Sequence, residues 1–198
     1  SDHSVLVRLT TASGVVGWGE CVSVVAPQVA ATIVGELLGP LLVGRDPMDS
    51  TAIFEDLYNA MRVRGYFGGF YVDAIAALDI AIWDIKGKLI GMPISKLLGG
   101  RRHDRIPAYV SGLPAPTLDQ RVEMACLWAG RGFPAIKFAA AVAHQGEYHE
   151  MRRLREALGP EVKILVDLHW RYTAAEAIQL IRRLEEFDLY LAEAPVHS

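Results

Sequence analysis

Short apolar runs alternate with helical segments beyond residue 105, and this alternation constrains the fold more than any other feature of the sequence. The apolar runs are IPAYVSG, FPAIKFAA, VKILVD and LYLAEAP, and the segments between them repeat apolar residues at helical spacing. Strands that alternate with helices are typical of parallel α/β architecture, because a helix must carry the chain back to the starting edge of the sheet. The sequence therefore predicts β/α units over residues 106–198.

Residues 1–105 show a different pattern. The stretch SVLVRLTTASGVVGWGEC alternates apolar and polar residues on both sides of TASG, which favours an antiparallel hairpin. Helical spacing follows in VAATIVGELLGPLL, PMDSTAIFEDLYNAM and VDAIAALDIAIWDIKGKLIG, with Asp49 and Ser50 as candidate caps of the second of these helices. We therefore expect an α+β domain over residues 1–105, followed by the β/α units.

Ionisable residues stand at the ends of three successive predicted strands. Side chains alternate between the faces of a strand, so Asp167 and His169 in KILVDLH lie opposite the aliphatic residues at the alternate positions. The same rule groups Lys137 with Ala135 and Ala139 of PAIKFAA, and it groups Glu193 with both leucines of LYLAEAP. Because parallel α/β folds carry their sites at the carboxyl ends of strands, we expect these four ionisable side chains to converge on one cavity.

Two acidic residues on one face favour a bound cation. Burying Asp167 and Glu193 together is costly unless a positive charge pairs them. Carboxylate oxygens are the ligands that Mg²⁺ prefers, and Mg²⁺ keeps water positions open for a substrate. The alternative is structural, since strand-end acids also cap helices or bind loop amides, and Lys137 can extend its stem along the surface. The spacing alone leaves both interpretations open.

Charge and composition argue against several classes of partner. The 198 residues carry 20 Lys and Arg against 23 Asp and Glu, a net charge of −3, without a block of like charges. Nucleic acid is not an expected partner, since phosphate binding needs a concentrated basic face. No apolar run approaches the roughly 20 residues that cross a bilayer, and the two cysteines lack the spacing of a zinc site or a disulfide framework. We expect a cytoplasmic protein without a membrane segment.

Two segments resemble a known family. The stretch AIAALDIAIWDIKGKLIGMPISKLLGG, residues 74–100, closely resembles the end of the capping domain in the mandelate racemase and muconate lactonizing branch of the enolase superfamily. GVVGWGE, residues 14–20, is similar to the second capping strand of that family, and the two segments occur in the family's order. The resemblance extends over essentially the whole chain. It implies an α+β capping domain followed by a (β/α) TIM-like barrel, and a homo-oligomer.

The resemblance also implies a metal centre and a longer enzyme. In this family three successive barrel strands each supply one carboxylate to Mg²⁺; Asp167 looks like the first ligand and Glu193, in LAEAP, like the second. The third would follow Ser198. A complete barrel takes about 250 residues, so residues 106–198 correspond to its first four β/α units, and the family's first capping strand would precede Ser4. We therefore expect a fragment that is inactive by itself.

The residue types at the strand ends bear on the reaction. The step shared by this superfamily removes a proton α to a carboxylate with a Lys or His base and holds the resulting enediolate on Mg²⁺. Racemase-like members end the second barrel strand with Lys-x-Lys, where this sequence has Lys137-Phe138-Ala139. Ala139 has no proton to exchange, which argues against a two-base racemase and leaves Lys137 to pair with a substrate carboxylate or the enediolate.

His169 distinguishes most strongly between reactions. The Asp-x-His strand ending resembles that of galactonate and mannonate dehydratases, in which this His protonates the departing hydroxyl. Free imidazole gains and loses a proton near neutral pH, which suits that role. The resemblance thus implies dehydration of a sugar acid to a 2-keto-3-deoxy acid. Racemisation, epimerisation and cycloisomerisation are the alternatives, as are a non-catalytic fragment and a role for His169 that only orients Asp167.

Four further residues are candidates for substrate contact. Trp170 and Arg171 follow His169 directly, although a packing Trp and a solvated Arg fit the sequence equally well. Glu20 and Cys21 precede the stretch VSVVAP, a loop that the resemblance places over the barrel mouth. The apolar character of this loop argues against a sugar acid, and the sequence does not settle that conflict.

Overall fold

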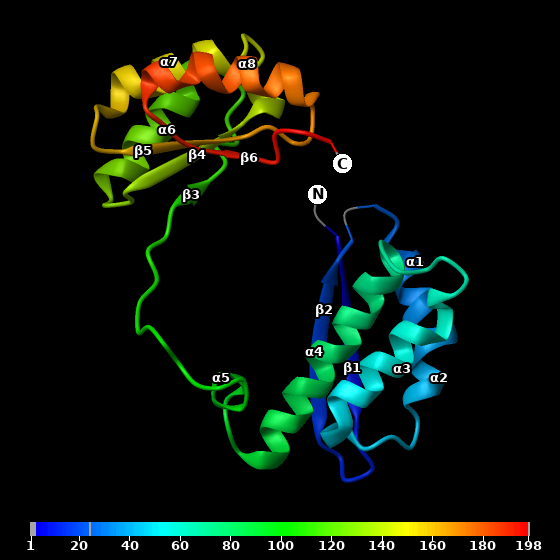
Figure 1. Ribbon diagram of the computed structural model, residues 1–198. Helices are drawn as coiled ribbons and strands as arrows, with labels where there is room; N and C mark the ends of the chain where they lie inside the picture. Colours follow the sequence, from blue (N-terminus) through cyan, green and yellow to red (C-terminus); the bar gives the residue numbers. More distant parts are fainter. Residues whose placement is uncertain (1–2, 24, 198) are drawn as a thin grey trace. The chain divides into compact units, whose positions relative to one another are not determined.

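The chain folds into two units. The computed structural model describes residues 3–23 and 25–197 (Figure 1), and it divides into compact units of residues 1–104 and 105–198. The first unit combines a β-hairpin with helices, and the second alternates parallel strands with helices. The predicted fold class, an α+β unit followed by β/α units, is confirmed.

The first unit begins with an antiparallel hairpin. β1 (Ser4–Thr10) pairs along its whole length with β2 (Val16–Val22). Thr11 closes the turn, because its amide donates to the Val15 carbonyl at 2.9 Å and its hydroxyl oxygen accepts from the Val15 amide at 3.0 Å. Gly14 completes the turn with a φ of 85°, a conformation that residues with a Cβ rarely adopt.

The long helix α4 (Phe70–Ile90) forms the core of the first unit. Its Ala74, Ile75, Ala77 and Leu78 are fully buried, as expected for a helix that is apolar on most of its surface. The hairpin and the shorter helices pack around it. These shorter elements are α1 (Pro27–Thr32), the π-helical η1 (Ile33–Leu38), α2 (Gly39–Leu42), the 3₁₀ turn η2 (Pro47–Asp49), α3 (Ser50–Arg62) and α5 (Ile94–Leu97).

The entrance to α3 agrees with the predicted one only in part. Asp49 stands at the N-cap position of α3, as expected, but its side chain makes no capping hydrogen bond. Asp46 caps the preceding turn η2, because its side chain accepts from the Met48 amide at 2.9 Å. Ser50 is the first residue of α3, and its hydroxyl accepts from Lys86 Nζ at 3.1 Å.

Two glycines let α4 approach β2 closely. A Cβ built on Gly17 would lie 2.2 Å from the carbonyl oxygen of Ala81, and one built on Gly19 would lie 1.8 Å from that of Ala77. Both distances are far inside van der Waals contact, so the backbone of α4 occupies the space that a side chain would need. The two glycines of GWGE thus set the spacing between helix and sheet.

Gly19→Ala is expected to destabilise the first unit by about 3 kcal/mol, because overpacking against a helix backbone cannot be relieved by a side-chain rotation. Urea unfolding followed by circular dichroism measures this loss. Gly35→Ala is the control, since a Cβ at that position meets nothing within 4 Å. Equal unfolding midpoints for the two variants would contradict the close approach.

Asp84 on α4 ties the helix to the hairpin. Its Oδ2 accepts from the Trp18 amide at 2.9 Å and from Lys88 Nζ at 2.7 Å, and Lys88 also donates to the Val16 carbonyl at 2.8 Å. The hydrogen bond from Lys88 lowers the pKa of Asp84 most; burial opposes this effect, and the Trp18 amide and the Lys88 charge add to it. The net result is a pKa below the ordinary value.

Asp84→Asn is expected to cost about 1 kcal/mol at neutral pH. Folding lowers the pKa of this carboxyl, so its stabilisation is present above the unfolded-state pKa and is lost as the pH falls through the folded-state pKa. Urea unfolding of both proteins from about pH 7 to about pH 3 should therefore show a difference that shrinks below about pH 4. If the difference in stability between the two proteins stays constant over this pH range, the Asp84 carboxylate does not stabilise the contact between α4 and the hairpin.

Four parallel strands form the sheet of the second unit. Their order is β3 (Val110–Ser111), β4 (Ala135–Ala139), β5 (Lys163–Asp167) and β6 (Leu189–Glu193). The connections contain α6 (Leu118–Gly130), α7 (Glu147–Leu158) and α8 (Ala174–Leu184), with 3₁₀ turns η3 (Ala140–Val142) and η4 (Glu185–Phe187). Figure 1 shows the three helices on one face of this sheet.

The aliphatic face of the sheet packs against these helices. Ile136 and Phe138 of β4, and Ile164 and Val166 of β5, are fully buried in one cluster, together with Leu168 just beyond β5. This cluster includes residues of all three helices. The alternation read from the sequence is confirmed for β4 and β5, and it leaves the opposite face for the ionisable residues.

A bulge changes the alternation in β6. Consecutive residues of β5 pair with Leu189 and Leu191, so Tyr190 between them has no partner. One extra residue moves the side chains before it to the other face, and Leu189 packs with Ala192 against the buried cluster. The prediction that Leu189 shares a face with Glu193 is therefore wrong.

Helix length bears on the membrane question. Within residues 3–23 and 25–197, no single helix is long and apolar enough to cross a bilayer. Two successive helical segments, residues 27–42 and 47–62, meet the length and composition criteria only as a pair, which is bent by 119°. Leu38, Ile53 and Leu57 of this pair are buried in the core of the first unit.

Candidate metal and active site

Neighbouring strands bring two carboxylates and an ammonium group together. Asp167 and Glu193 end β5 and β6 and are register partners in the parallel sheet. Lys137 lies two residues before the end of β4; its Nζ is 3.8 Å from Asp167 Oδ2 and donates a hydrogen bond to Glu193 Oε2. The three residues form one ionic cluster on the sheet face opposite the buried aliphatic residues.

Lys137 is the buried member of the cluster. The residue is 7% exposed, and its Nζ lies 5.6 Å from the centre of the Tyr109 ring. Burial by itself lowers the pKa of Lys137, but the hydrogen bond and charge of Glu193, followed by Tyr109 and Asp167, outweigh it and raise the pKa above the ordinary value. Lys137 is therefore a cation that neutralises the two acids.

His169 lies beside Asp167. Its Nδ1 is 3.0 Å from Asp167 Oδ1, and its backbone amide donates to the same oxygen at 3.1 Å. The His169 side chain is 43% exposed, against 18% for Asp167. The imidazole thus sits at the rim of the cluster, with one ring nitrogen next to a carboxylate and part of the ring open to solvent.

A strained turn carries His169. The Arg171 amide donates to the Leu168 carbonyl at 3.2 Å, and the residues between them, His169 and Trp170, have φ angles of 50° and 54°. Two positive φ angles characterise the type I′ turn, whose central positions favour Asn and Gly. Larger residues in this region cost on the order of 1–3 kcal/mol each and persist only where the surroundings hold them, often at functional sites.

Trp170 and Arg171 differ in how they are held. Trp170 is 61% exposed, and its ring lies edge-on to the His169 ring with centroids 6.4 Å apart. Arg171 is fixed by the connection after β4, because its Nη1 donates to the Ala140 carbonyl at 3.0 Å and lies 3.8 Å from Glu147 Oε1. Trp170 is thus available for contact with a ligand, whereas Arg171 already has protein partners.

Glu147 and Tyr172 were not singled out in the sequence. The Tyr172 hydroxyl donates to Glu147 Oε1 at 2.6 Å, and Glu147 is only 8% exposed. Burial, then the hydrogen bond and charge of Glu147, raise the pKa of Tyr172 to about 12. The two residues are 25 positions apart, and no local spacing pattern indicates the pair.

Glu20 and Cys21 belong to the first unit. Glu20 is exposed on β2, while Cys21 is 6% exposed and lies in the core cluster around α4. Burial, followed by the charges of Asp73 and Glu20, raises the pKa of the Cys21 thiol, which the backbone hydrogen bonds only partly oppose. Within its own unit Cys21 is a packing residue.

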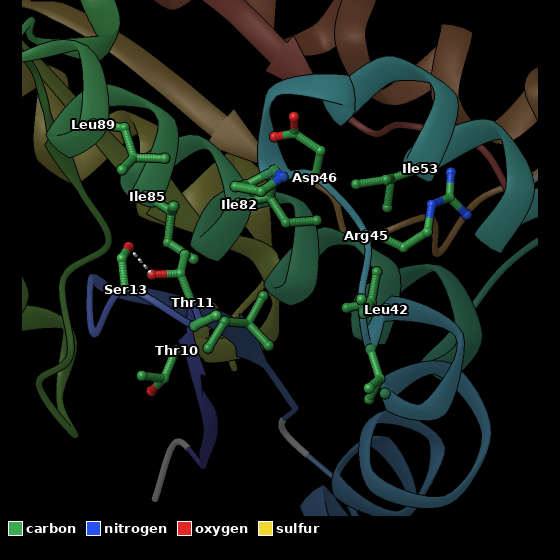
Figure 2. Close-up of a pocket in the computed structure, with 16 residues that line it drawn as sticks. Thr10, Thr11, Ser13, Leu42, Arg45, Asp46, Ile53, Ile82, Ile85 and Leu89 are labelled. Carbon is green, nitrogen blue, oxygen red and sulfur yellow. Dashed lines mark hydrogen bonds between the residues drawn. The ribbon is translucent and has the colours of Figure 1, made fainter.

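A separate pocket opens in the first unit (Figure 2). Its volume is about 740 Å³, and the turn after β1, residues 42–47 and the C-terminal part of α4 line it. Its charged residues already have partners, since Asp46 caps η2 and Arg45 pairs with Asp56 at 2.9 Å. Thr11 and Ser13 bind each other at 2.9 Å. None of the predicted site residues lines this pocket.

The donor chemistry of Asp167 and Glu193 fits Mg²⁺. Proteins often bind Mg²⁺ through one or two carboxylates, with water or substrate completing the octahedron. In the part of the chain that the structure describes, no group of three or more His, Cys, Asp and Glu side chains is placed to hold an ion. The strand ends therefore offer two carboxylates, and the cation that pairs them in this structure is Lys137.

Two protein-family models match this chain, one in each of its two units. The family model described as mandelate racemase / muconate lactonizing enzyme, N-terminal domain, matches residues 1–99, and the enolase C-terminal domain-like model matches residues 120–198. The chain belongs to the mandelate racemase and muconate lactonizing enzyme family of the enolase superfamily. The resemblance read from residues 14–20 and 74–100 is thereby confirmed.

Curated relatives in this family carry the names of different reactions. A D-galactarolactone cycloisomerase of Agrobacterium fabrum is 36% identical in an alignment 196 residues long that covers 97% of this chain and 51% of the relative. A D-galactonate dehydratase of Xanthomonas euvesicatoria is 34% identical in an alignment 202 residues long that covers 96% of this chain and 51% of the relative. The chain thus spans about half the length of these relatives.

Solved structures of family members share the fold. A member of the enolase superfamily from Agrobacterium tumefaciens matches with a TM-score of 0.93 and 53% identity, covering 98% of this chain and 50% of that one. A racemase from Streptomyces coelicolor with bound magnesium matches with a TM-score of 0.89 and 30% identity, covering 99% and 59%. The capping unit and the first part of a barrel are therefore the fold of this chain.

Lys137→Met is expected to lower stability by about 1–2 kcal/mol at pH 7, because it leaves two neighbouring carboxylates without a cation. Urea unfolding at pH 7 measures this loss. Lys163→Met is the matched control, since Lys163 begins β5 and lies over the Tyr190 ring at 4.3 Å. Equal losses for both variants at pH 7 would count against the ionic cluster.

Proposed function

We propose that this chain supplies the capping domain and the first part of the active site of a Mg²⁺-dependent dehydratase that acts on a sugar acid. The observation that carries the proposal is the contact of His169 Nδ1 with Asp167 Oδ1 at 3.0 Å, on a face shared with Glu193 and Lys137. An imidazole beside an acid pair is suited to proton transfer next to a metal. The galactonate dehydratase among the relatives supports this reaction.

Asp167 and Glu193 are the residues that would hold Mg²⁺. Bound there, Mg²⁺ would supply positive charge to the substrate carboxylate while its α-proton is removed. Lys137 would bind the negative charge of the same substrate. Its raised pKa keeps the ammonium protonated at neutral pH, which suits charge neutralisation and not proton removal.

His169 is assigned the role of general acid. Loss of the C2 proton to a base leaves electrons that form the C2–C3 double bond as the C3–O bond breaks. His169 gives its proton to the departing hydroxyl, which leaves as water, and the enol that remains tautomerises to a 2-keto-3-deoxy acid. Asp167 holds the orientation of the imidazole, since its Oδ1 lies 3.0 Å from Nδ1.

His169→Asn is expected to lower kcat for sugar-acid dehydration by about 10²–10⁴-fold, the usual contribution of a general acid. The test uses a polypeptide of the relatives' full length that carries this sequence, with Mg²⁺ and a panel of C5 and C6 sugar acids. Detection of 2-keto-3-deoxy products gives turnover, and calorimetry gives Mg²⁺ affinity, which should persist.

His144→Asn is the control for this variant, because His144 is exposed in the connection after β4 and contacts none of the cluster residues. Full turnover by His169→Asn would remove His169 from the mechanism. Absence of turnover with every sugar acid in the panel would overturn the dehydratase proposal.

Cycloisomerisation is the second candidate, favoured by the 36% identity to D-galactarolactone cycloisomerase. The two reactions differ in mass balance, because dehydration releases one water and an isomerisation releases nothing. Mass spectrometry of the product in the same assay therefore separates them. A product with the mass of the substrate in ordinary water, which takes up deuterium at the carbon α to the carboxylate when the assay is run in D2O, would favour the isomerase.

A further inference from the structure

The turn that carries His169 contains little support of its own. It is closed by one backbone hydrogen bond, from the Arg171 amide to the Leu168 carbonyl at 3.2 Å, and its two central residues have positive φ angles. Neither His169 nor Trp170 is a residue that favours this conformation in the way that Asn or Gly does. Contacts from outside must therefore hold the turn.

The strand β6 holds one side of this turn through the backbone. The Leu168 amide donates to the Glu193 carbonyl at 2.9 Å, and the Trp170 amide donates to the Ala194 carbonyl at 2.8 Å. Tyr172 then forms a parallel bridge with Val196. These contacts fix the path of the chain along β6 and leave the side chains that follow His169 to be held elsewhere.

Glu147 holds the other side. Its Oε1 accepts from the Tyr172 hydroxyl at 2.6 Å and lies 3.8 Å from Arg171 Nη1, so it binds the two residues that follow the strained pair. Arg171 also donates to the Ala140 carbonyl at 3.0 Å, in the same connection between β4 and α7. One carboxylate thus links the end of β5 to the start of α7.

The position of Glu147 is itself well fixed. It is the first residue of α7 and is 8% exposed, and the positive end of the helix dipole favours a negative charge there. A buried carboxylate needs a hydrogen bond or a paired charge, and Glu147 has a hydrogen bond from the Tyr172 hydroxyl and the Arg171 guanidinium as an ion-pair partner at 3.8 Å. Its side chain is accordingly a rigid support.

We propose that Glu147 is a positioning residue for His169: through Tyr172 and Arg171 it holds the strained turn that places the imidazole beside Asp167. The inference rests on the proposed function only in taking His169 as the acid. The partners of Glu147 described above are Tyr172 and Arg171, and not Lys137, Asp167 or Glu193, so it acts through the turn.

Amide hydrogen exchange of this chain, followed by NMR, tests the support directly. In Glu147→Gln and Tyr172→Phe, the Trp170 amide should exchange about tenfold faster relative to amides within β4 and β5, equivalent to a loss of ~1.4 kcal/mol in local stability. Tyr172→Phe removes one hydroxyl and decides the matter if Glu147→Gln does not fold. An unchanged ratio in both variants would overturn the proposal.

Glu150→Gln is the matched control. Glu150 lies three residues further along α7, is 1% exposed, and binds Arg121 Nε at 2.6 Å and Nη2 at 2.8 Å. Its replacement disturbs a buried ion pair of the same helix but not the turn, so all amides should respond together. A selective effect on Trp170 in this control would show that any loss in α7 loosens the turn.

Activity separates this inference from the proposed function. In a polypeptide of the relatives' length, Glu147→Gln should lower kcat about tenfold, with KM and Mg²⁺ affinity unchanged. If the unsubstituted protein dehydrates sugar acids and Glu147→Gln leaves kcat unchanged, the inference fails and the function stands. If no sugar acid is dehydrated but the Trp170 amide is selectively exposed, the function fails and the support of the turn stands.

Discussion

The charge balance between Lys137 and two carboxylates is the constraint on which the candidate site depends. Asp167 and Glu193 are register partners, so the sheet itself places their side chains on one face. Two acids so close would repel each other, and the buried ammonium of Lys137 offsets that repulsion. The helices take the aliphatic residues of the other face, which leaves the polar residues a single face to occupy. The ionic cluster on one face of the sheet and the packing of the helices on the other face are therefore two consequences of the same alternation along β4 and β5.

Much of this arrangement could be predicted because it depends on local periodicity. A strand repeats every two residues and a helix every 3.6, so the order of strands and helices and the common face of Lys137 and Asp167 follow from the sequence. The close packing of α4 on β2 also has a local cause, because the glycines of GWGE leave no side chain in the way. The family resemblance supplied the roles assigned to the acids, which periodicity alone left open.

The rest could not be predicted because it depends on contacts between distant positions or on backbone conformation. The bulge at Tyr190 reverses the faces within β6 without any Gly or Pro to mark it. The left-handed conformations of His169 and Trp170 contradict the preferences of those residue types, and contacts from β6 and α7 hold them. Glu147 lies 25 residues from Tyr172, and no local spacing pattern connects the two positions. Tertiary packing decides such positions, and one sequence does not reveal it.

The strands and the turn that carry the residues of this site differ in how easily mutation can change them. Asp167 and Glu193 sit on the hydrogen-bonded ladder, where a shift of either side chain would require a shift of the whole strand. His169 and Trp170 sit on a turn whose geometry depends on a few replaceable side chains. Mutations can therefore exchange the side chain at position 169 while the paired carboxylates keep their places. Such a division lets one scaffold diverge in chemistry without rebuilding its charged centre, in keeping with the dehydratase and cycloisomerase names among the relatives of this chain.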